Sequence, residues 1–190
     1  FNGCRFEGNV AGGGGGGMDC TLYASPSLQN CRFESNRADW GAGISCRDYS
    51  SPVVMSTIFS GNRTEGSRGY GGGAFCHLDS KPMFIACTFT ENEARYGGAV
   101  ANFTDSGASL VRSTLVANRG TWRGAGIYTS NAVTAVNASI IAFHEGSGIH
   151  SGGTYGPQVY QSILYGNAGG DWIGGAAVSR RSARFREEGA

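Results

Sequence analysis

The sequence predicts an all-β fold in which short parallel strands wind into a solenoid of about seven coils, each 23–30 residues long. Three observations lead to this prediction. One pattern recurs along the chain, glycine and proline punctuate its copies, and no segment carries a convincing apolar face at helical spacing. A repeat of this length cannot bury its apolar residues alone, so stacked copies must share one core.

The repeat is clearest between Pro82 and Val100, where Asn92 anchors the pattern. Equivalent anchors follow at spacings of 27, 26, 30, 26, 26 and 23 residues: Asn9, Asn36, Asn62, Asn92, Asn118, His144 and Asn167. Coils stack about 4.8 Å apart, and buried amides need hydrogen-bond partners. We therefore expect the asparagine amides to form a ladder along the solenoid.

Two columns of the repeat are apolar in every copy. Eight residues before the anchors stand Phe1, Leu28, Val54, Phe84, Leu110, Val136 and Val159. Three residues before them stand Phe6, Phe33, Phe59, Phe89, Leu115, Ile141 and Leu164. Between these lies a column of small, weakly polar residues: Cys4, Cys31, Thr57, Cys87, Ser113, Ser139 and Ser162. Because side chains alternate along a strand, the odd spacing of the two apolar columns predicts a bend between them.

Proline and glycine mark the corners of each coil. All four prolines, Pro26, Pro52, Pro82 and Pro157, stand ten residues before an anchor, where a strand is expected to begin. Glycine doublets or their near relatives follow the anchors, as at Gly72-Gly73 and Gly97-Gly98. An apolar residue usually comes next: Met18, Ile44, Phe75, Val100, Ile127 and Ile149.

The charge pattern argues against a nucleic-acid partner. Only 15% of residues are charged, against about 25% in ordinary proteins, and the formal net charge is +1. No basic stripe is present apart from Arg180, Arg181, Arg184 and Arg186, which we interpret as a solvated tail. No run approaches the roughly 18 apolar residues of a membrane helix, and Phe1 already falls in register with the repeat. We expect a monomeric fragment of a longer chain, without membrane insertion by this segment.

The motif from Asn30 to Ala38, Asn-Cys-Arg-Phe-Glu-Ser-Asn-Arg-Ala, followed by Gly41-Ala42-Gly43-Ile44, resembles the repeat of right-handed parallel β-helix proteins of the pectin-lyase-like superfamily. Its FxxN and GGA[ILV] elements are similar to those of chlamydial polymorphic outer-membrane proteins and bacterial secreted β-helix proteins. The resemblance covers residues 1 to about 175 and implies a right-handed solenoid from an exported bacterial protein. We assign residues 1–178 to the β-helix and residues 179–190 to a charged, frayed tail.

Three aspartates are the candidates for catalysis. Asp48 and Asp79 each lie four residues after the apolar residue of the glycine corner, and Asp105 lies five after it, so they can stack on successive coils. The resemblance implies calcium-binding carboxylates with an Arg or Lys base in lyases, or paired acids in hydrolases, and Arg47, His77 and Lys81 lie nearby. The competing interpretation is that Asp simply favours turns. We expect no cofactor, with calcium as the alternative.

Aromatic residues precede the glycine corners of four consecutive coils: Trp40, Tyr70, Tyr96 and Trp122. If these rings face outward, they form a strip on which sugar rings can stack, with Arg37, Arg63 and Arg119 beside it. If they face the coils, they are a packing ladder over bare glycine corners. The sequence leaves both interpretations open.

The six cysteines also fall into columns. Cys4, Cys31 and Cys87 share the small-residue column, and Cys20 and Cys46 share another, with Cys76 one place away. Stacked neighbours fall within the Cα range of disulfides. The interchange of Cys with Ser and Thr favours buried thiols instead, and no spacing indicates zinc or a nucleophile with a partnered His and Asp.

We therefore predict a non-catalytic, secreted or cell-surface domain that presents an elongated surface for adhesion or glycan binding, with a polysaccharide or a host or cell-surface glycan as its expected partner. A polysaccharide lyase or glycoside hydrolase is the alternative from another class. A passive stalk is the third.

Overall fold

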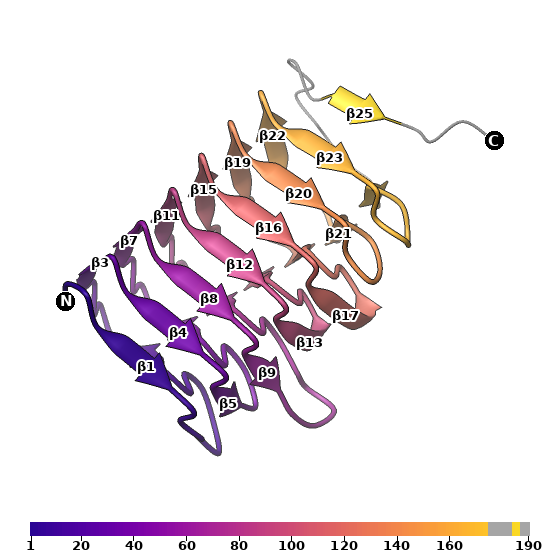
Figure 1. Cartoon of the computed structure of the whole chain (residues 1–190). Helices are drawn as coiled ribbons and strands as arrows, with labels where there is room; N and C mark the ends of the chain where they lie inside the picture. The colour runs from indigo at the N-terminus through magenta and orange to yellow at the C-terminus, as the bar shows by residue number, and fades with distance from the viewer. Residues whose placement is uncertain (175–183, 187–190) are drawn as a thin grey trace.

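The computed structural model describes residues 1–174 and the backbone of residues 184–186. Regular structure in these residues is entirely β, in strands of two to five residues. Each strand pairs in parallel with the equivalent strand of the next coil, as in the register Phe33↔Phe59, and the coils stack along one axis (Figure 1). The predicted all-β parallel solenoid is confirmed. No helix in the described residues is long and apolar enough to cross a membrane.

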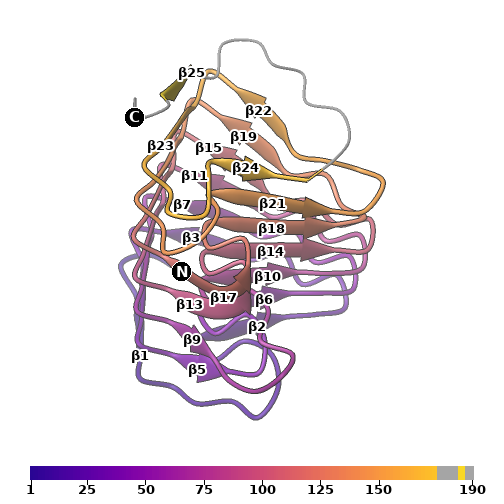
Figure 2. The ribbon, with the colours of Figure 1, turned by 90° about the vertical axis from the view of Figure 1, so that its right-hand side faces the viewer.

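Four parallel sheets run along the solenoid (Figures 1 and 2). The eight-stranded sheet contains β1 (Arg5–Glu7), β4 (Arg32–Glu34), β8 (Ile58–Ser60), β12 (Thr88–Thr90), β16 (Thr114–Val116), β20 (Ile140–Ala142), β23 (Ile163–Tyr165) and β25 (Arg184–Arg186). The seven-stranded sheet contains β2 (Met18–Cys20), β6 (Ile44–Cys46), β10 (Ala74–Cys76), β14 (Val100–Phe103), β18 (Ile127–Ser130), β21 (Ile149–Gly152) and β24 (Trp172–Ile173).

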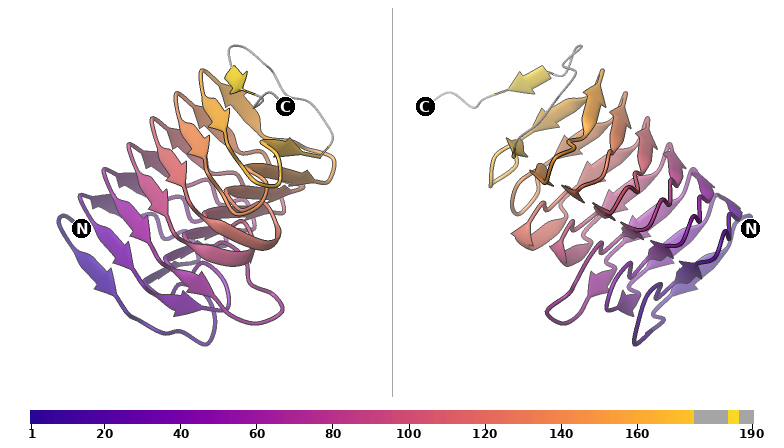
Figure 3. Two further views of the ribbon diagram at one scale, coloured as in Figure 1. Left: turned by 45° about the vertical axis from the view of Figure 1, so that its right-hand side comes forward. Right: turned by 180° about the vertical axis from the view of Figure 1, so that it is seen from behind.

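The two smaller sheets complete each coil. The six-stranded sheet contains β3 (Ser27–Gln29), β7 (Val53–Met55), β11 (Met83–Ile85), β15 (Ser109–Val111), β19 (Ala135–Asn137) and β22 (Gln158–Tyr160). The four-stranded sheet contains β5 (Arg37–Ala38), β9 (Arg63–Thr64), β13 (Glu93–Tyr96) and β17 (Arg119–Arg123). Figure 3 shows from two sides that each coil repeats the path of the one before it.

The core is built from the two apolar columns that the sequence predicts. Phe33, Phe59 and Phe89 are fully buried, and their rings stack with centroids 4.8 and 4.6 Å apart and nearly parallel planes. Phe84, from the other apolar column, meets the ring of Phe89 edge-on at 5.3 Å. Offset and edge-on contacts are the favoured arrangements of aromatic rings, so the repeat spacing itself creates a favourable stack.

The predicted bend between the apolar columns is a residue with positive φ. It is glycine in the first coil, and in later coils it is Asn30, Ser56, Ala86, Arg112, Ala138 and Gln161, with φ between 46° and 53°. Such a backbone costs a non-glycine residue about 1–2 kcal/mol. The small-residue column follows at this corner and offsets part of that cost, because its hydroxyls accept backbone N–H groups of the preceding coil. The N–H of Cys87, for example, donates to Oγ of Ser113 at 3.2 Å.

The predicted alignment of the repeat at Phe75 is wrong by one residue. Phe75 was taken as the equivalent of Ile44, but Ile44 pairs with Ala74, which lies inside. Phe75 instead points to the outer face of the seven-stranded sheet and is covered there by the ring of Tyr70. The shift also brings Cys76 opposite Cys46 rather than one place away.

The boundary predicted at residue 178 lies outside the described residues. Of the expected frayed tail, residues 179–190, the structure describes only the backbone of Arg184–Arg186, which adds β25 to the edge of β23. The body from Phe1 to Gly174 follows the repeat.

Candidate functional site

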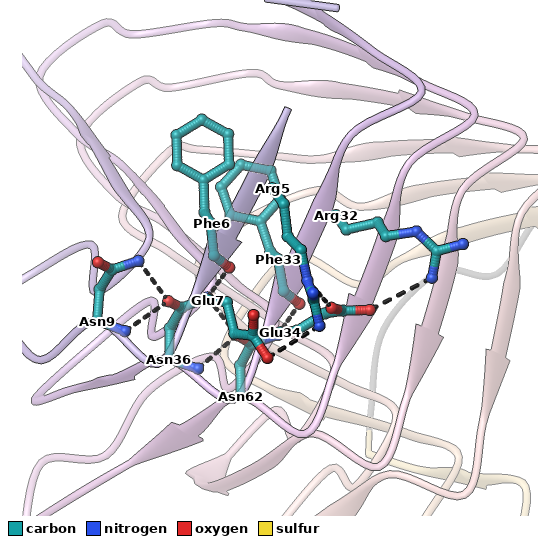
Figure 4. A network of polar contacts seen from close by, with 9 residues as sticks. All are labelled: Arg5, Phe6, Glu7, Asn9, Arg32, Phe33, Glu34, Asn36 and Asn62. Atoms are coloured by element: carbon teal, nitrogen blue, oxygen red, sulfur yellow. Dashed lines mark hydrogen bonds and ion pairs between the residues drawn. The ribbon is translucent and has the colours of Figure 1, made fainter. Parts of the chain in front are cut away.

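The predicted anchors form a continuous hydrogen-bonded column, part of which is shown in Figure 4. The Nδ2 of Asn36 donates to Oδ1 of Asn62 at 2.9 Å, and the Nδ2 of Asn62 donates to Oδ1 of Asn92 at 2.9 Å. Each Nδ2 also donates to a carbonyl of the preceding coil, as Asn62 does to Phe33 at 2.8 Å. The column comprises Asn9, Asn36, Asn62, Asn92, Asn118 and, after His144, Asn167. These side chains join the coils and leave the surface to other residues.

His144 interrupts the amide column. Its Nδ1 accepts the backbone N–H of Asn118 at 3.0 Å, and its own backbone N–H donates to Oδ1 of Asn167 at 3.2 Å. The Nδ2 of Asn118 keeps the usual bond to the preceding coil, at the carbonyl of Phe89, and donates its second hydrogen to the carbonyl of Val116 instead of to an amide of the next coil. Burial lowers the pKa of His144 to about 4, so the imidazole is neutral at pH 7.

The three candidate aspartates do not form one site. Asp48, Asp79 and Asp105 all have positive φ, between 55° and 58°, at the turns after the seven-stranded sheet. Asp79 aligns with Asp105 of the next coil, since its N–H donates to the carbonyl of Thr104. It aligns with Tyr49 rather than Asp48 of the preceding coil, since the N–H of Tyr49 donates to the carbonyl of Leu78. Asp48 instead accepts a hydrogen bond from Thr21 at 2.7 Å. This geometry favours the turn interpretation, because Asp adopts left-handed conformations readily.

The neighbours of these aspartates have partners of their own. Arg47 bonds Asp19 at 2.8 Å, and its guanidinium lies 5.9 Å from the ring of Trp40. Burial lowers the pKa of His77, with Asp48 opposing and Arg47 adding to the effect. Lys81 is exposed. Within the described residues, no group of three or more His, Cys, Asp and Glu side chains is placed to hold a metal ion.

The aromatic candidates separate into a strip and an outlier. Bridges align Trp40 with Tyr70 and Tyr70 with Tyr96, and all three are half-buried. They pack on the outer face of the seven-stranded sheet, where Tyr70 contacts Phe103 at 4.6 Å and Tyr96 contacts Tyr128 at 5.0 Å between centroids. The aromatic strip, Trp40, Tyr70 and Tyr96, therefore combines packing with partial exposure.

Trp122 does not continue the strip. A register shift between β13 and β17 places Arg123, not Trp122, opposite Tyr96. Trp122 is consequently 60% exposed. The guanidinium of Arg95 bridges the two features, since it lies 5.7 Å from the centroid of Tyr96 and 5.4 Å from that of Trp122. The expectation that all four rings align is wrong at this coil.

A hollow of about 370 Å³ opens beside Trp122, and we call it the Trp122 hollow. Three coils contribute its walls: Gly120, Trp122, Arg123, Gly124, Gly146, Ser147, His150, Gly169 and Ile173. Four of these nine residues are glycines, which let neighbouring coils approach closely at these corners: an added Cβ at Gly169, for example, would lie 2.6 Å from the backbone nitrogen of Ser147. Its size falls within the roughly 300–1,000 Å³ of small-ligand pockets.

Polar groups of the Trp122 hollow are few but distinct. Arg123 has no carboxylate partner among the residues that the structure describes. Burial and the nearby Arg123 both lower the pKa of His150, so its imidazole is neutral at pH 7 and offers one donor and one acceptor. The lining of the hollow thus combines the indole ring of Trp122, the permanently charged guanidinium of Arg123 and the neutral imidazole of His150.

Comparison with protein families settles the class of the fold. The model for the right-handed β-helix region matches residues 1–118, which is more than half of the chain. The chain is a right-handed β-helix protein. No curated protein and no solved structure matches it.

In this right-handed β-helix the predicted arginine column is paired with acids. Arg37 contacts Glu65 at 2.7 Å, and Glu93 lies between Arg63 and Arg119 at 3.6 and 3.8 Å. A similar network of Arg5, Glu7, Arg32 and Glu34 lies on the outer face of the eight-stranded sheet (Figure 4). Exposed pairs of this kind contribute about 0–1 kcal/mol each. Arg37, Arg63 and Arg119 are thus engaged by acidic neighbours.

The cysteines of the β-helix are all free thiols. Cys20, Cys46 and Cys76 are aligned on successive coils inside the seven-stranded sheet. In the other column, Sγ of Cys31 donates to the carbonyl of Gln29 at 3.2 Å, and burial raises the pKa of Cys87 to about 11. Low thiolate content makes such thiols unreactive, which supports the interpretation of cysteine as a small core residue.

Sequence reasoning singled out Trp122 but missed Arg123 and His150 as site residues. The available signal was a departure from the pattern: Trp40, Tyr70 and Tyr96 directly precede glycine, whereas Arg123 separates Trp122 from Gly124. His150 pairs with Ile173 and Tyr128 on the outer face of the seven-stranded sheet. The strand pairing in the structure was needed to show that His150 lines the same hollow as Trp122.

Proposed function

We propose that this right-handed β-helix binds a glycan without catalysis, and that the Trp122 hollow is the main contact. The observation that carries the proposal is an exposed tryptophan beside a hollow of about 370 Å³ on a rigid parallel stack. Exposed aromatic rings are costly in water and concentrate at binding surfaces. This ring is 60% exposed although neighbouring strip residues are half-buried.

A sugar suits this combination of groups. A pyranose ring has an apolar face of C–H groups, which can lie on the indole, and a rim of hydroxyls, which needs donors and acceptors. Ser147, Arg123 and His150 line the hollow and supply both kinds of partner. Rigid placement favours binding, because little conformational entropy is lost when the ligand arrives.

The aromatic strip extends the proposed surface. It leads away from the hollow across successive coils, and Arg95 connects its last ring, Tyr96, to Trp122. A chain of sugars that fills the hollow with one residue can therefore continue over Tyr96 and Tyr70. We also propose that the protein is exported or displayed on the cell surface, where polysaccharides and host glycans are available; the likeness of its repeat to secreted β-helix proteins supports this.

A glycan array followed by fluorescence titration tests the proposal. Trp40→Phe and Trp172→Phe leave Trp122 as the single tryptophan, and a bound sugar should change its emission. Trp122→Ala should weaken binding at least tenfold, because the stacking surface is lost. Tyr49→Ala is the matched control, since Tyr49 is also exposed, at 53%, but lies at a turn remote from the hollow-lining residues.

Two results would contradict the proposal. Absence of any glycan ligand would favour a passive stalk. Formation of unsaturated uronides from an acidic polysaccharide, lost in Asp79→Asn, would show a lyase and refute the non-catalytic function.

A further inference from the structure

His144 joins the three chain segments that form the Trp122 hollow. Through Asn118 it is bonded to the segment that continues directly into β17, which carries Trp122. Two residues after His144 the chain reaches Gly146 and Ser147 in the wall. Through Asn167 it is bonded to the segment that reaches Gly169. His144 is thus bonded to both neighbouring coils, through its imidazole to Asn118 and through its backbone N–H to Asn167, in addition to the backbone ladder that joins the coils.

The imidazole is bonded on one side only. Because Nδ1 accepts the N–H of Asn118, the ring proton resides on Nε2. That Nε2 is buried, and no described residue accepts its hydrogen. It faces the backbone of Gly126, where an added Cβ would lie 2.7 Å from Nε2. His144 as a whole is 2% exposed, so burial disfavours a positive charge on the ring.

The charged groups of the neighbouring elements are engaged elsewhere. Arg119 and Glu145 pair with each other at 3.3 Å on the outside of the column. Asp171 accepts a hydrogen bond from Nδ2 of Asn167 at 2.6 Å. Arg123 and His150 line the hollow itself. None of these groups is hydrogen-bonded to the ring of His144.

We propose that His144 makes the Trp122 hollow open in acid: protonation of Nδ1 removes the acceptor for Asn118, loosens the β17 wall against the wall formed by Gly146 and Ser147, and releases the bound ligand. The release step rests on the proposed glycan binding, whereas the opening does not. An amide anchor has no such response, because asparagine does not titrate. The histidine rung therefore gives this end of the solenoid a pH dependence that the asparagine rungs lack.

The sign and size of the effect follow from proton linkage. The native pKa of about 4 lies below the ordinary value of 6.5, so the closed form is favoured at neutral pH and is progressively lost as pH falls from 6.5 toward 4. For one group with these two values, the equilibrium constant for local opening should rise about 20-fold between pH 7 and pH 5.

Hydrogen exchange tests the opening without any ligand. We expect the amide of Asn118, corrected for its intrinsic exchange rate, to show this 20-fold rise between pH 7 and pH 5, while the amide of Asn62 shows none. His144→Asn introduces the anchor found in the other six repeats and should remove the rise. His150→Gln is the second variant; it keeps His144 and should retain the rise.

The outcomes separate the two proposals. If His144→Asn keeps the pH dependence, or if the wild-type Asn118 amide shows none, the acid-opening proposal is wrong whether or not a glycan binds. If the exchange behaves as expected but no glycan is found on the array, the glycan proposal alone fails. Loss of the pH dependence in His150→Gln would assign the effect to His150 and refute the role of His144.

Discussion

Replacing Asn92 by leucine tests whether the amide column stabilises the solenoid. Asn92 is fully buried, and its side chain makes four hydrogen bonds. Its Nδ2 donates to Asn118 and to the carbonyl of Phe59, both at 2.9 Å. Its Oδ1 accepts from Nδ2 and from the backbone N–H of Asn62, at 2.9 and 3.1 Å. At about 1 kcal/mol for each bond, the loss approaches about 4 kcal/mol.

The geometry adds a further cost and a partial compensation. The backbone N–H of Asn62 would remain buried without its acceptor, and an orphaned buried donor costs about 1–3 kcal/mol. Leucine regains part of this by burying more apolar surface, about 1.5–3 kcal/mol for a complete side chain. We expect Asn92→Leu to lower the free energy of unfolding by about 3 kcal/mol.

Asn9 provides the matched control within the same column. It is exposed at the first coil, and its side chain donates one hydrogen bond, to Oδ1 of Asn36 at 2.9 Å. Asn9→Leu should therefore cost about 1 kcal/mol or less. Urea denaturation followed by far-ultraviolet circular dichroism measures both variants. Equal losses for the two, within about 0.5 kcal/mol, would refute the idea that the buried column stabilises the stack.

Three further predictions concern the core, the corners and metal. Phe89→Ala should lower the free energy of unfolding by about 3–5 kcal/mol in urea, because it leaves a cavity in the Phe59–Phe89 stack; a loss below about 1 kcal/mol would show that the cavity collapses freely. Gly97→Ala should lower the melting temperature much more than Gly61→Ala. Both glycines have φ above 60°, so the backbone strain is similar. An added Cβ at Gly97 would clash with the carbonyl of Val100, whereas one at Gly61 would contact only the side chain of Ser35, at 3.6 Å. Equal shifts would contradict the steric argument. Chelation by EDTA should leave the melting temperature unchanged, because no group of three or more His, Cys, Asp and Glu side chains among the described residues is placed to hold a metal ion; a fall that disappears in Asp79→Asn would reveal a calcium site.

The fold could be predicted from the sequence because its cause is periodic. Phe33, Phe59 and Phe89 recur at one offset from the anchors, and stacking converts that offset into a core without knowledge of distant contacts. The anchors themselves were predictable for the same reason, since Asn36 and Asn62 must be neighbours in any such stack. Periodicity fixes what lies above and below each residue.

Periodicity does not fix local register at the corners, and the site depends on that register. Phe75 is apolar but lies on the outer face of the seven-stranded sheet, under Tyr70. Its hydrophobicity therefore suggested an alignment with Ile44, which in fact pairs with Ala74. At β17 the irregular pairing with β13 turns Trp122 outward and brings Arg123 opposite Tyr96. The Trp122 hollow is then lined by residues from three different coils. These features depend on backbone geometry that short-range sequence patterns do not encode.

The parallel register also determines how the molecule responds to force. All ladder hydrogen bonds between coils point along the axis, as in the direct pairing of Phe33 with Phe59. Tension applied between the two ends therefore acts on these layers in series, and they separate one after another rather than shearing together. Each layer released would extend the chain by about 90 Å for a coil of 26 residues. A protein built in this way would absorb mechanical work coil by coil while its remaining coils keep their shape.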